Sequence, residues 1–205
     1  DDPQETICET CGRGGDAYRL KIFDPENPDI ELPKGEVGHI AGKGACLMLG
    51  YFDNQKATEE SFNKDGWFLS GDLGLIDEND CLRFVGRLKD IIIRGGKNIH
   101  PKKIEDLAIK HPNVEKAAAF PVPDERLGER VCLAVMPTGG TPEGQNVLGH
   151  LFNEGLSIYD MPEYYIVMSD FPLTASGKIL KRELAEWAKE GRISPDPIRF
   201  EKPQA

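Results

Sequence analysis

A small polar loop at residues 172–178 presents one ammonium group, that of Lys178, just before an apolar helical pattern. Such a loop can carry a lysine into a cleft, where its charge would stabilise a phosphate or a carboxylate. The loop is not a phosphate-binding P-loop, because the upstream glycine spacing and the following Ser or Thr are missing. Taken alone, it fits an exposed surface lysine better, since that is the usual position of this residue.

The stretch from Trp67 to Asp72 offers a carboxylate at the end of an aromatic, strand-like pattern. Gly71 leaves room for the backbone to approach a ligand closely. The carboxylate of Asp72 can then accept two hydrogen bonds from a vicinal diol such as a ribose. On its own, this stretch is more simply a turn that carries a carboxylate.

A third stretch, residues 86–105, interrupts a buried-looking strand with basic residues and then places two glycines, Gly95 and Gly96, in a row. Arg87 offers a planar fork for phosphate or ribose oxygens, and the glycines leave space for a thin ligand arm. An edge strand, a glycine turn and a helix opened by Pro101 explain the apolar residues. They explain less well why four basic residues gather here: Arg87, Lys89, Arg94 and Lys97.

These stretches need a scaffold, and its first part is predicted to be β-rich. Alternating apolar residues predict a strand at 18–23, with further short strands at 37–40 and 45–49. Asn54 is predicted to cap a short helix, and the acidic stretch 77–80 predicts a hairpin turn.

The pattern changes character between Gly86 and Asp90, where we place a domain boundary. The second part mixes helical stripes with strands, so the predicted fold class is α+β: a β-rich part at 1–86 and a compact α+β domain at 87–205. Its predicted strands lie at 114–122, 131–136 and 164–168, and its helices begin at Pro101 and include 147–152 and 180–187.

Composition excludes several kinds of partner. The net charge of −10 argues against non-specific binding of nucleic acid or anionic membranes, and no apolar run approaches the roughly 18 residues that span a bilayer. Five scattered cysteines favour a reducing, cytoplasmic location over a disulfide framework. Cys8 and Cys11 form a CxxC pair without two further ligands, so unpaired thiols are favoured over zinc, and no metal site is predicted in this chain.

Together, in this order and spacing, the three stretches resemble the adenylate-forming superfamily of acyl-CoA synthetases, nonribosomal-peptide adenylation domains and luciferases. The pattern is closest to bacterial aryl, alicyclic and medium-chain acyl-CoA ligases. Residues 35–40 and 50–52 also resemble that superfamily's small β-barrel subdomain, which implies a distorted barrel before residue 87 and a mobile C-terminal domain after it. The implied reaction joins a carboxylic acid to ATP, giving acyl-AMP and pyrophosphate, and then transfers the acyl group to CoA.

The resemblance also implies a role for each candidate residue. Lys178 would assist adenylation and withdraw when the C-terminal domain rotates about a hinge at Lys89. The remaining roles are nucleotide binding by Asp72 and Arg87, and lining of the pantetheine tunnel by Gly95 and Gly96. Lys97 departs from the pattern, because close relatives carry an acidic residue there. The motif around Lys178 also resembles one that lysine acetyltransferases modify in bacterial acyl-CoA ligases, which would remove its charge.

Two motifs of the superfamily are missing: the Ser/Thr/Gly-rich phosphate loop and the aromatic-Gly-x-Thr-Glu motif, whose Glu holds Mg²⁺. The Mg²⁺ ligand and the acid pocket are therefore expected outside this chain. The sequence, which opens without Met or a signal peptide, is expected to be a fragment, inactive in adenylation by itself. Two alternatives stay open: an adenylation domain serving a carrier protein, and a non-catalytic nucleotide- or CoA-binding module. The absence of an appended carrier domain and the joint presence of Asp72, Arg87 and Lys178 favour the CoA ligase.

Overall fold

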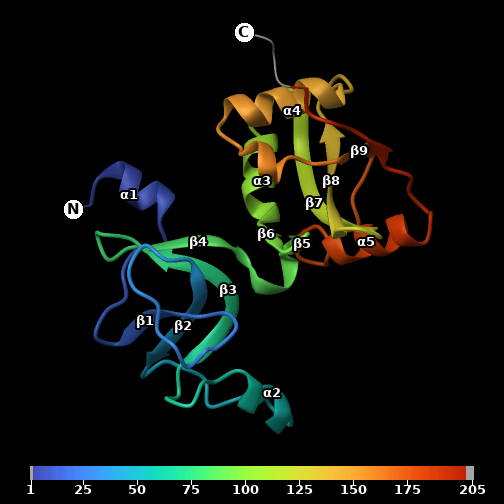
Figure 1. The fold of residues 1–205 in the computed structure, drawn as a ribbon. Helices are drawn as coiled ribbons and strands as arrows, with labels where there is room; N and C mark the ends of the chain where they lie inside the picture. The colour runs from blue at the N-terminus through green and yellow to red at the C-terminus, as the bar shows by residue number, and fades with distance from the viewer. Residues whose placement is uncertain (1, 202–205) are drawn as a thin grey trace. The chain divides into compact units, whose positions relative to one another are not determined.

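The computed structural model describes residues 2–201, which fall into two compact units. The first unit ends at Lys89 and the second begins at Asp90. Figure 1 shows the strands of the first unit in blue to green and those of the second mostly in green to yellow. No helix among residues 2–201 is long and apolar enough to cross a membrane.

The first unit is built on a four-stranded antiparallel sheet. Its strands, in spatial order, are β1 (Tyr18–Phe23), β2 (Gly38–Gly44), β3 (Phe68–Ile76) and β4 (Leu82–Arg87), and its helices are α1 (Gln4–Glu9) and α2 (Gln55–Glu60). Neighbouring residues of β1 point to opposite faces: Ile22 packs with Ile40 and Leu82, whereas Phe23 packs with Ala41 and Trp67. Apolar clusters therefore form on both faces of this sheet.

A predicted helix cap and a predicted hairpin turn of the first unit are confirmed. The side chain of Asn54 accepts a hydrogen bond from the backbone N–H of Ala57 at 3.0 Å and so caps α2. The acidic turn at 77–80 joins β3 to β4, and Asp80 adopts a left-handed backbone with φ of 61°. Aspartate tolerates this conformation better than most residues do.

The predicted strand at 45–49 is wrong. The chain turns after β2, where the N–H of Leu47 donates to the carbonyl oxygen of Gly44 at 3.2 Å. β1 begins at Tyr18, which lies opposite Gly44, and the pairing ends just beyond this point, where the N–H of Ala45 donates to the carbonyl oxygen of Ala17 at 3.1 Å. The apolar residues at 45–49 therefore gain no ladder, and Leu49 is fully exposed.

The predicted barrel is also not seen among residues 2–201. Their first-unit strands form an open sheet with β1 and β4 at its edges. The prediction of a mixed α+β fold is confirmed, and the strands of the first unit pair antiparallel.

The second unit is a six-stranded sheet with helices on both faces. Strands β10, β9, β8, β5 and β6 follow one another in space, and β7 also pairs with β8. The strands are β5 (Ile92–Arg94), β6 (Lys97–Ile99), β7 (Val114–Asp124), β8 (Gly128–Pro137), β9 (Tyr164–Val167) and β10 (Asp196–Pro197). The helices are α3 (Pro101–Ala108), α4 (Gly144–Asn153) and α5 (Lys181–Lys189), with a short 3₁₀ turn η2 (Ile158–Asp160). A further 3₁₀ turn, η1 (Leu88–Asp90), spans the boundary between the units.

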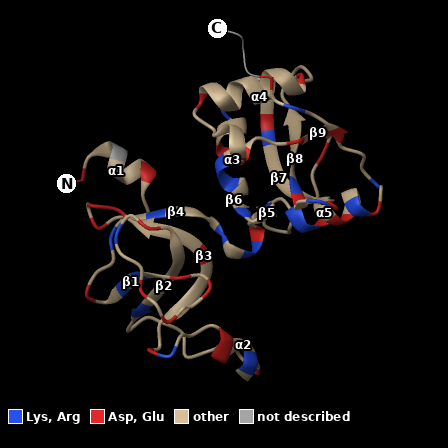
Figure 2. Cartoon of the chain, viewed as in Figure 1, with Lys and Arg blue, Asp and Glu red and all other residues tan. Residues whose placement is uncertain are grey.

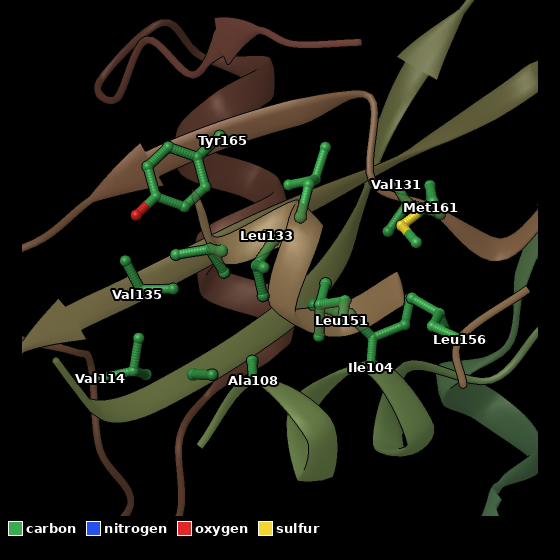
Figure 3. Close-up of a cluster of buried hydrophobic side chains, with 14 of the residues drawn as sticks. Ile104, Ala108, Val114, Val131, Leu133, Val135, Leu151, Leu156, Met161 and Tyr165 are labelled. Atoms are coloured by element: carbon green, nitrogen blue, oxygen red, sulfur yellow. The ribbon is translucent and has the colours of Figure 1, made fainter. Parts of the chain in front are cut away.

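Alternation along β8 separates two hydrophobic clusters. Val131, Leu133 and Val135 face the cluster that includes Ile104 of α3 and Leu151 of α4, and Figure 3 shows these side chains converging there. Cys132 and Ala134 face the other cluster, with Phe120 of β7, Phe171 and Leu184 of α5. Because β8 is buried on both faces, it appears in the sequence as a continuous apolar run.

The main elements of the second unit are confirmed. Pro101 is the first residue of α3, where its missing N–H has no helical partner to lose. The apolar stripes of α4 and α5 place Leu148, Leu151 and Leu184 in the core with no exposed surface. The sequence reasoning missed α1, the two 3₁₀ turns, β6 and β10, which are too short to show a hydrophobic period.

Candidate functional site

Asp72 and Arg87 lie side by side, as expected of two residues that would share a ligand. They are cross-strand partners on β3 and β4, and Arg87 Nε lies 3.2 Å from Asp72 Oδ1. The Arg87 side chain is 66% exposed and that of Asp72 31% exposed. An ion pair this open contributes about 0–1 kcal/mol to stability, so both groups can turn toward a ligand at little cost.

The backbone ahead of Asp72 is held in an unusual shape. Gly71 has φ of 80°, in the left-handed region, and the N–H of Asp72 donates to Ser70 Oγ at 3.1 Å. The N–H of Gly71 donates to Nε2 of His39 at 2.8 Å, next to an irregularity in the pairing of β2 with β3. His39 therefore supplies the acceptor that a regular ladder would have supplied.

His39 is a functional candidate that the sequence reasoning missed. It is buried, and burial lowers its pKa, an effect that the nearby Asp72 carboxylate partly offsets. The neutral ring is also what the geometry needs, because Nε2 must keep its lone pair to accept from Gly71. A histidine inside an apolar strand pattern was the available signal, since a buried polar group needs a partner.

We expect His39 to make the stability of the chain depend on pH. The folded chain binds a proton at His39 less readily than the unfolded chain, so below about pH 6.5 the unfolded state holds more protons. The contribution of His39 to the free energy of unfolding is therefore complete above that pH. It is lost as the pH falls toward the lowered pKa of His39. Urea unfolding between neutral pH and about pH 5 would measure this dependence.

His39→Gln is the matched variant, because the amide oxygen can accept from Gly71 without titrating. Its unfolding free energy should vary less with pH than that of the unchanged chain. An identical pH dependence in the two proteins would contradict the role assigned to His39.

Lys178 lies at the end of a tight hairpin whose two arms are hydrogen-bonded to each other. Leu173 and Ile179 form a bridge, the N–H of Thr174 donates to the carbonyl oxygen of Lys178 at 2.8 Å, and the N–H of Lys178 donates to Thr174 Oγ1 at 3.0 Å. Gly177 turns the chain with φ of 80°. The Lys178 side chain is exposed, and its ammonium forms no ion pair within the described part of the second unit, residues 90–201. The hairpin thus presents a charge that the second unit does not neutralise.

Gly95 and Gly96 form the two-residue turn between β5 and β6. Both have positive φ, 57° and 83°, which a two-residue hairpin loop of this kind requires. A methyl group on Gly95 would lie 3.1 Å from Leu127 Cδ2, whereas one on Gly96 would meet open space. The backbone alone therefore accounts for both glycines, and their place in a CoA tunnel stays a prediction.

Three of the four gathered basic residues have carboxylate partners, Arg87 through its pair with Asp72. Arg94 Nη1 lies 3.0 Å from Glu163 Oε2, and Lys97 Nζ lies 2.6 Å from Asp160 Oδ1. Figure 2 shows the mixture of basic and acidic residues around β5, β6 and α5. Part of the basic pattern is thus explained by ion pairs with residues distant in sequence.

The predicted site residues divide between the two units. Asp72 and Arg87 belong to the first, and Lys178, Gly95 and Gly96 to the second. Lys89, the predicted hinge, is exposed in the 3₁₀ turn η1 and is the last residue of the first unit. Of these six residues, the structure brings only Asp72 and Arg87, and the adjacent Gly95 and Gly96, directly together.

The thiols of Cys8 and Cys11 are both exposed. Across residues 2–201, no group of three or more His, Cys, Asp or Glu side chains is arranged to hold a metal ion.

Known proteins similar to this chain include acyl-CoA synthetases and ligases. Residues 103–178 match the family described as the AMP-binding enzyme C-terminal domain. A putative acyl-CoA synthetase, YngI, of Bacillus subtilis is 36% identical over 178 residues, which cover 87% of this chain and 32% of that protein. The medium-chain fatty-acid–CoA ligase of Escherichia coli is 34% identical over 183 residues, covering 88% of this chain and 32% of the ligase.

Solved structures agree with the sequence relatives. ATP-bound MatB from Rhodopseudomonas palustris superposes with a TM-score of 0.81 at 34% identity, covering 90% of this chain and 37% of MatB. The o-succinylbenzoate CoA synthetase of Bacillus subtilis, bound to its acyl-adenylate, gives a TM-score of 0.80 at 27% identity over 98% of this chain. The chain thus spans about a third of the length of the curated relatives it matches, and its residues 103–178 identify it as a chain with an AMP-binding enzyme C-terminal domain, similar to that of acyl-CoA synthetases and ligases.

Proposed function

We propose that the intact protein is an AMP-forming acid–CoA ligase. A carboxylate oxygen attacks the α-phosphorus of ATP, and pyrophosphate leaves. The CoA thiolate then attacks the acyl carbonyl carbon, and AMP leaves with the electrons of the broken C–O bond. The observation that carries this proposal is the open Asp72–Arg87 pair, which offers a diol acceptor and an anion-binding fork side by side in a chain similar to acyl-CoA ligases.

In this proposal Asp72 accepts hydrogen bonds from the ribose hydroxyls, and Arg87 donates to ribose or phosphate oxygens. Lys178 neutralises the negative charge that concentrates where the carboxylate meets the α-phosphate. Magnesium would balance the charge of the ATP phosphates. The described residues do not offer it a ligand cluster, so its ligands would lie outside this chain.

The proposal includes a change of orientation between the two half-reactions, with Lys89 as the hinge. Lys89 lies in a short 3₁₀ turn at the end of the first compact unit, which supports a pivot there. After rotation, the turn at Gly95 and Gly96 would line the path of the pantetheine arm. The open space beside Gly96 supports this assignment. The open sheet of the first unit would form part of a barrel-like subdomain of the intact protein.

Lys178 is also proposed as a target of lysine acetylation. Its exposed side chain on a compact hairpin is accessible to another enzyme. Acetylation would remove the charge that adenylation uses. Mass spectrometry of the protein from cells with an active acetyltransferase tests this, and Lys178 found unmodified throughout would remove the idea.

The nucleotide assignment predicts that Asp72→Ala weakens ATP binding by the intact enzyme. Each hydrogen bond to a charged group is worth about 1.5–3 kcal/mol, so the loss should raise the Kd of ATP by about 10- to 100-fold. Calorimetric titration with ATP gives the Kd. The control is Glu78→Ala, which removes an exposed carboxylate from the turn of the same hairpin and should leave the Kd unchanged.

An unchanged Kd in the Asp72 variant would contradict the nucleotide site.

The products distinguish the remaining alternatives when a panel of aryl, alicyclic and short- to medium-chain acids is supplied with ATP and CoA. A CoA thioester supports the ligase. Acyl-AMP that forms without any thioester supports an adenylation domain serving a carrier protein.

A further inference from the structure

Lys181, three residues after Lys178, lies in a cluster of three charged side chains. It is the first residue of α5, and its Nζ lies 2.9 Å from Asp90 Oδ2 and 3.2 Å from Glu105 Oε1. The side chains are mostly buried, with exposed fractions of 23% for Lys181, 32% for Asp90 and 15% for Glu105. All three residues belong to the second unit.

The position of Lys181 goes against a local rule. The first turn of a helix carries a partial positive charge, which disfavours a lysine there. Two carboxylates around one ammonium compensate for that repulsion. The sequence therefore places a cation where the helix alone would not favour it, and tertiary contacts have to explain it.

The two carboxylates belong to the start of the second unit and to helix α3. Asp90 directly follows Lys89 and opens the second unit. Glu105 lies on α3, and its Oε1 also accepts a hydrogen bond from the N–H of Ala119 in β7 at 2.9 Å. Lys181 thus connects α5 to α3, to the central sheet and to the chain immediately after the proposed hinge.

The Lys178 hairpin is tied to the same helix. The N–H of Leu180, just before α5, donates to the carbonyl oxygen of Pro172 at 2.8 Å and closes the base of the hairpin. Ile179 packs against the cluster that contains Leu184 of α5. The base of the hairpin is therefore held by backbone and apolar contacts, and Lys181 fixes the start of α5 on which that base rests.

We infer that Lys181 is a positioning residue that fixes the Lys178 hairpin to the segment following Lys89, so that Lys178 moves with that segment as one body. This inference rests on the proposed function of Lys178 and goes beyond it, because Lys181 itself need not touch substrate. A lysine that is displaced by an ångström loses much of its effect on a reacting group.

Lys181→Met in the intact enzyme tests the inference. Methionine keeps the chain length and apolar stem but removes the ammonium. We expect ATP–pyrophosphate exchange to fall by about 10- to 100-fold, while thioester formation from supplied acyl-AMP and CoA stays within about twofold, because Lys178 serves only the first step. Lys181→Arg should restore most of the exchange activity, since its guanidinium can donate to both carboxylates.

Lys110→Met is the control, because it removes another lysine–carboxylate pair of the second unit, that of Lys110 with Glu154. It should leave both half-reactions unchanged. Should Lys181→Met fail to fold, Glu105→Gln replaces it, because the amide oxygen still accepts from Ala119 while the charge facing Lys181 is lost. The same split between half-reactions is expected from it.

Equal losses in both half-reactions would show that Lys181 is merely structural and would overturn the inference. So would unchanged exchange in Lys181→Met when Lys178→Ala abolishes it. If Lys178→Ala itself retains exchange, the proposed role of Lys178 fails first, and the two failures are thereby distinguished.

Discussion

Lys178→Ala in the intact enzyme is expected to lower acyl-AMP formation by about 100- to 1000-fold, the usual effect of removing one preorganised charge contact from a transition state. Its hairpin keeps its shape, because the backbone hydrogen bonds between residues 174 and 178 do not involve the ammonium. The loss should therefore come from missing charge and not from a misfolded loop.

The second half-reaction should be spared in the same variant. Thioester formation from supplied acyl-AMP and CoA needs no charge at the α-phosphate of ATP, so its rate should stay near that of the unchanged enzyme. ATP–pyrophosphate exchange and thioester release measure the two steps separately. Lys189→Ala, at the exposed far end of α5, is the matched control. Equal losses in the two steps would refute the assignment of Lys178 to adenylation.

Phe120→Ala should destabilise the second unit by about 3–5 kcal/mol, the usual cost of removing a buried aromatic ring. Phe120 has no exposed surface and packs in the cluster of Leu184 and Phe171, between the sheet and α5. Alanine leaves a cavity there that the close-packed neighbours fill only in part.

Urea unfolding of the 205-residue chain measures this effect, and its two tryptophans report on different units. Trp67 lies in the first unit and Trp187 in the second, so Trp67→Phe isolates the second transition. The control Phe52→Ala, read through Trp67 in the first unit, removes a fully exposed ring and should change the stability of that unit by less than about 0.5 kcal/mol. A Phe120→Ala transition at the same urea concentration as that of the unchanged chain would contradict the placement of Phe120 in the core.

Most of the fold could be predicted from the sequence because hydrophobic periods decide it. The stripes of α4 and α5 and the apolar run of β8 each match a buried surface. The strand predicted at 45–49 failed for a reason that no local pattern contains: β2 loses its partner where β1 begins, at Tyr18.

The site was harder to predict, because it depends on register and on distant partners. Asp72 faces Arg87 only because an irregularity in the pairing of β3 with β4 falls just beyond them, at Leu73 and Gly74. A slip of one residue would send the two side chains to opposite faces. The acceptor at His39 and the carboxylates around Lys181 lie far away in sequence, so spacing could not reveal them.

The central place of β8 has a consequence for how the second unit opens over time. β8 pairs with β7 along one edge, and it also pairs with β9 and β5. By contrast, β10 pairs with β9 through two residue pairs. Amides at a sheet edge exchange with solvent through local fraying, but those of a strand enclosed on both sides exchange only when the whole cooperative unit unfolds. Residues 131–135 therefore keep the longest-lived amide protons of this unit, and their exchange rate reports its global stability.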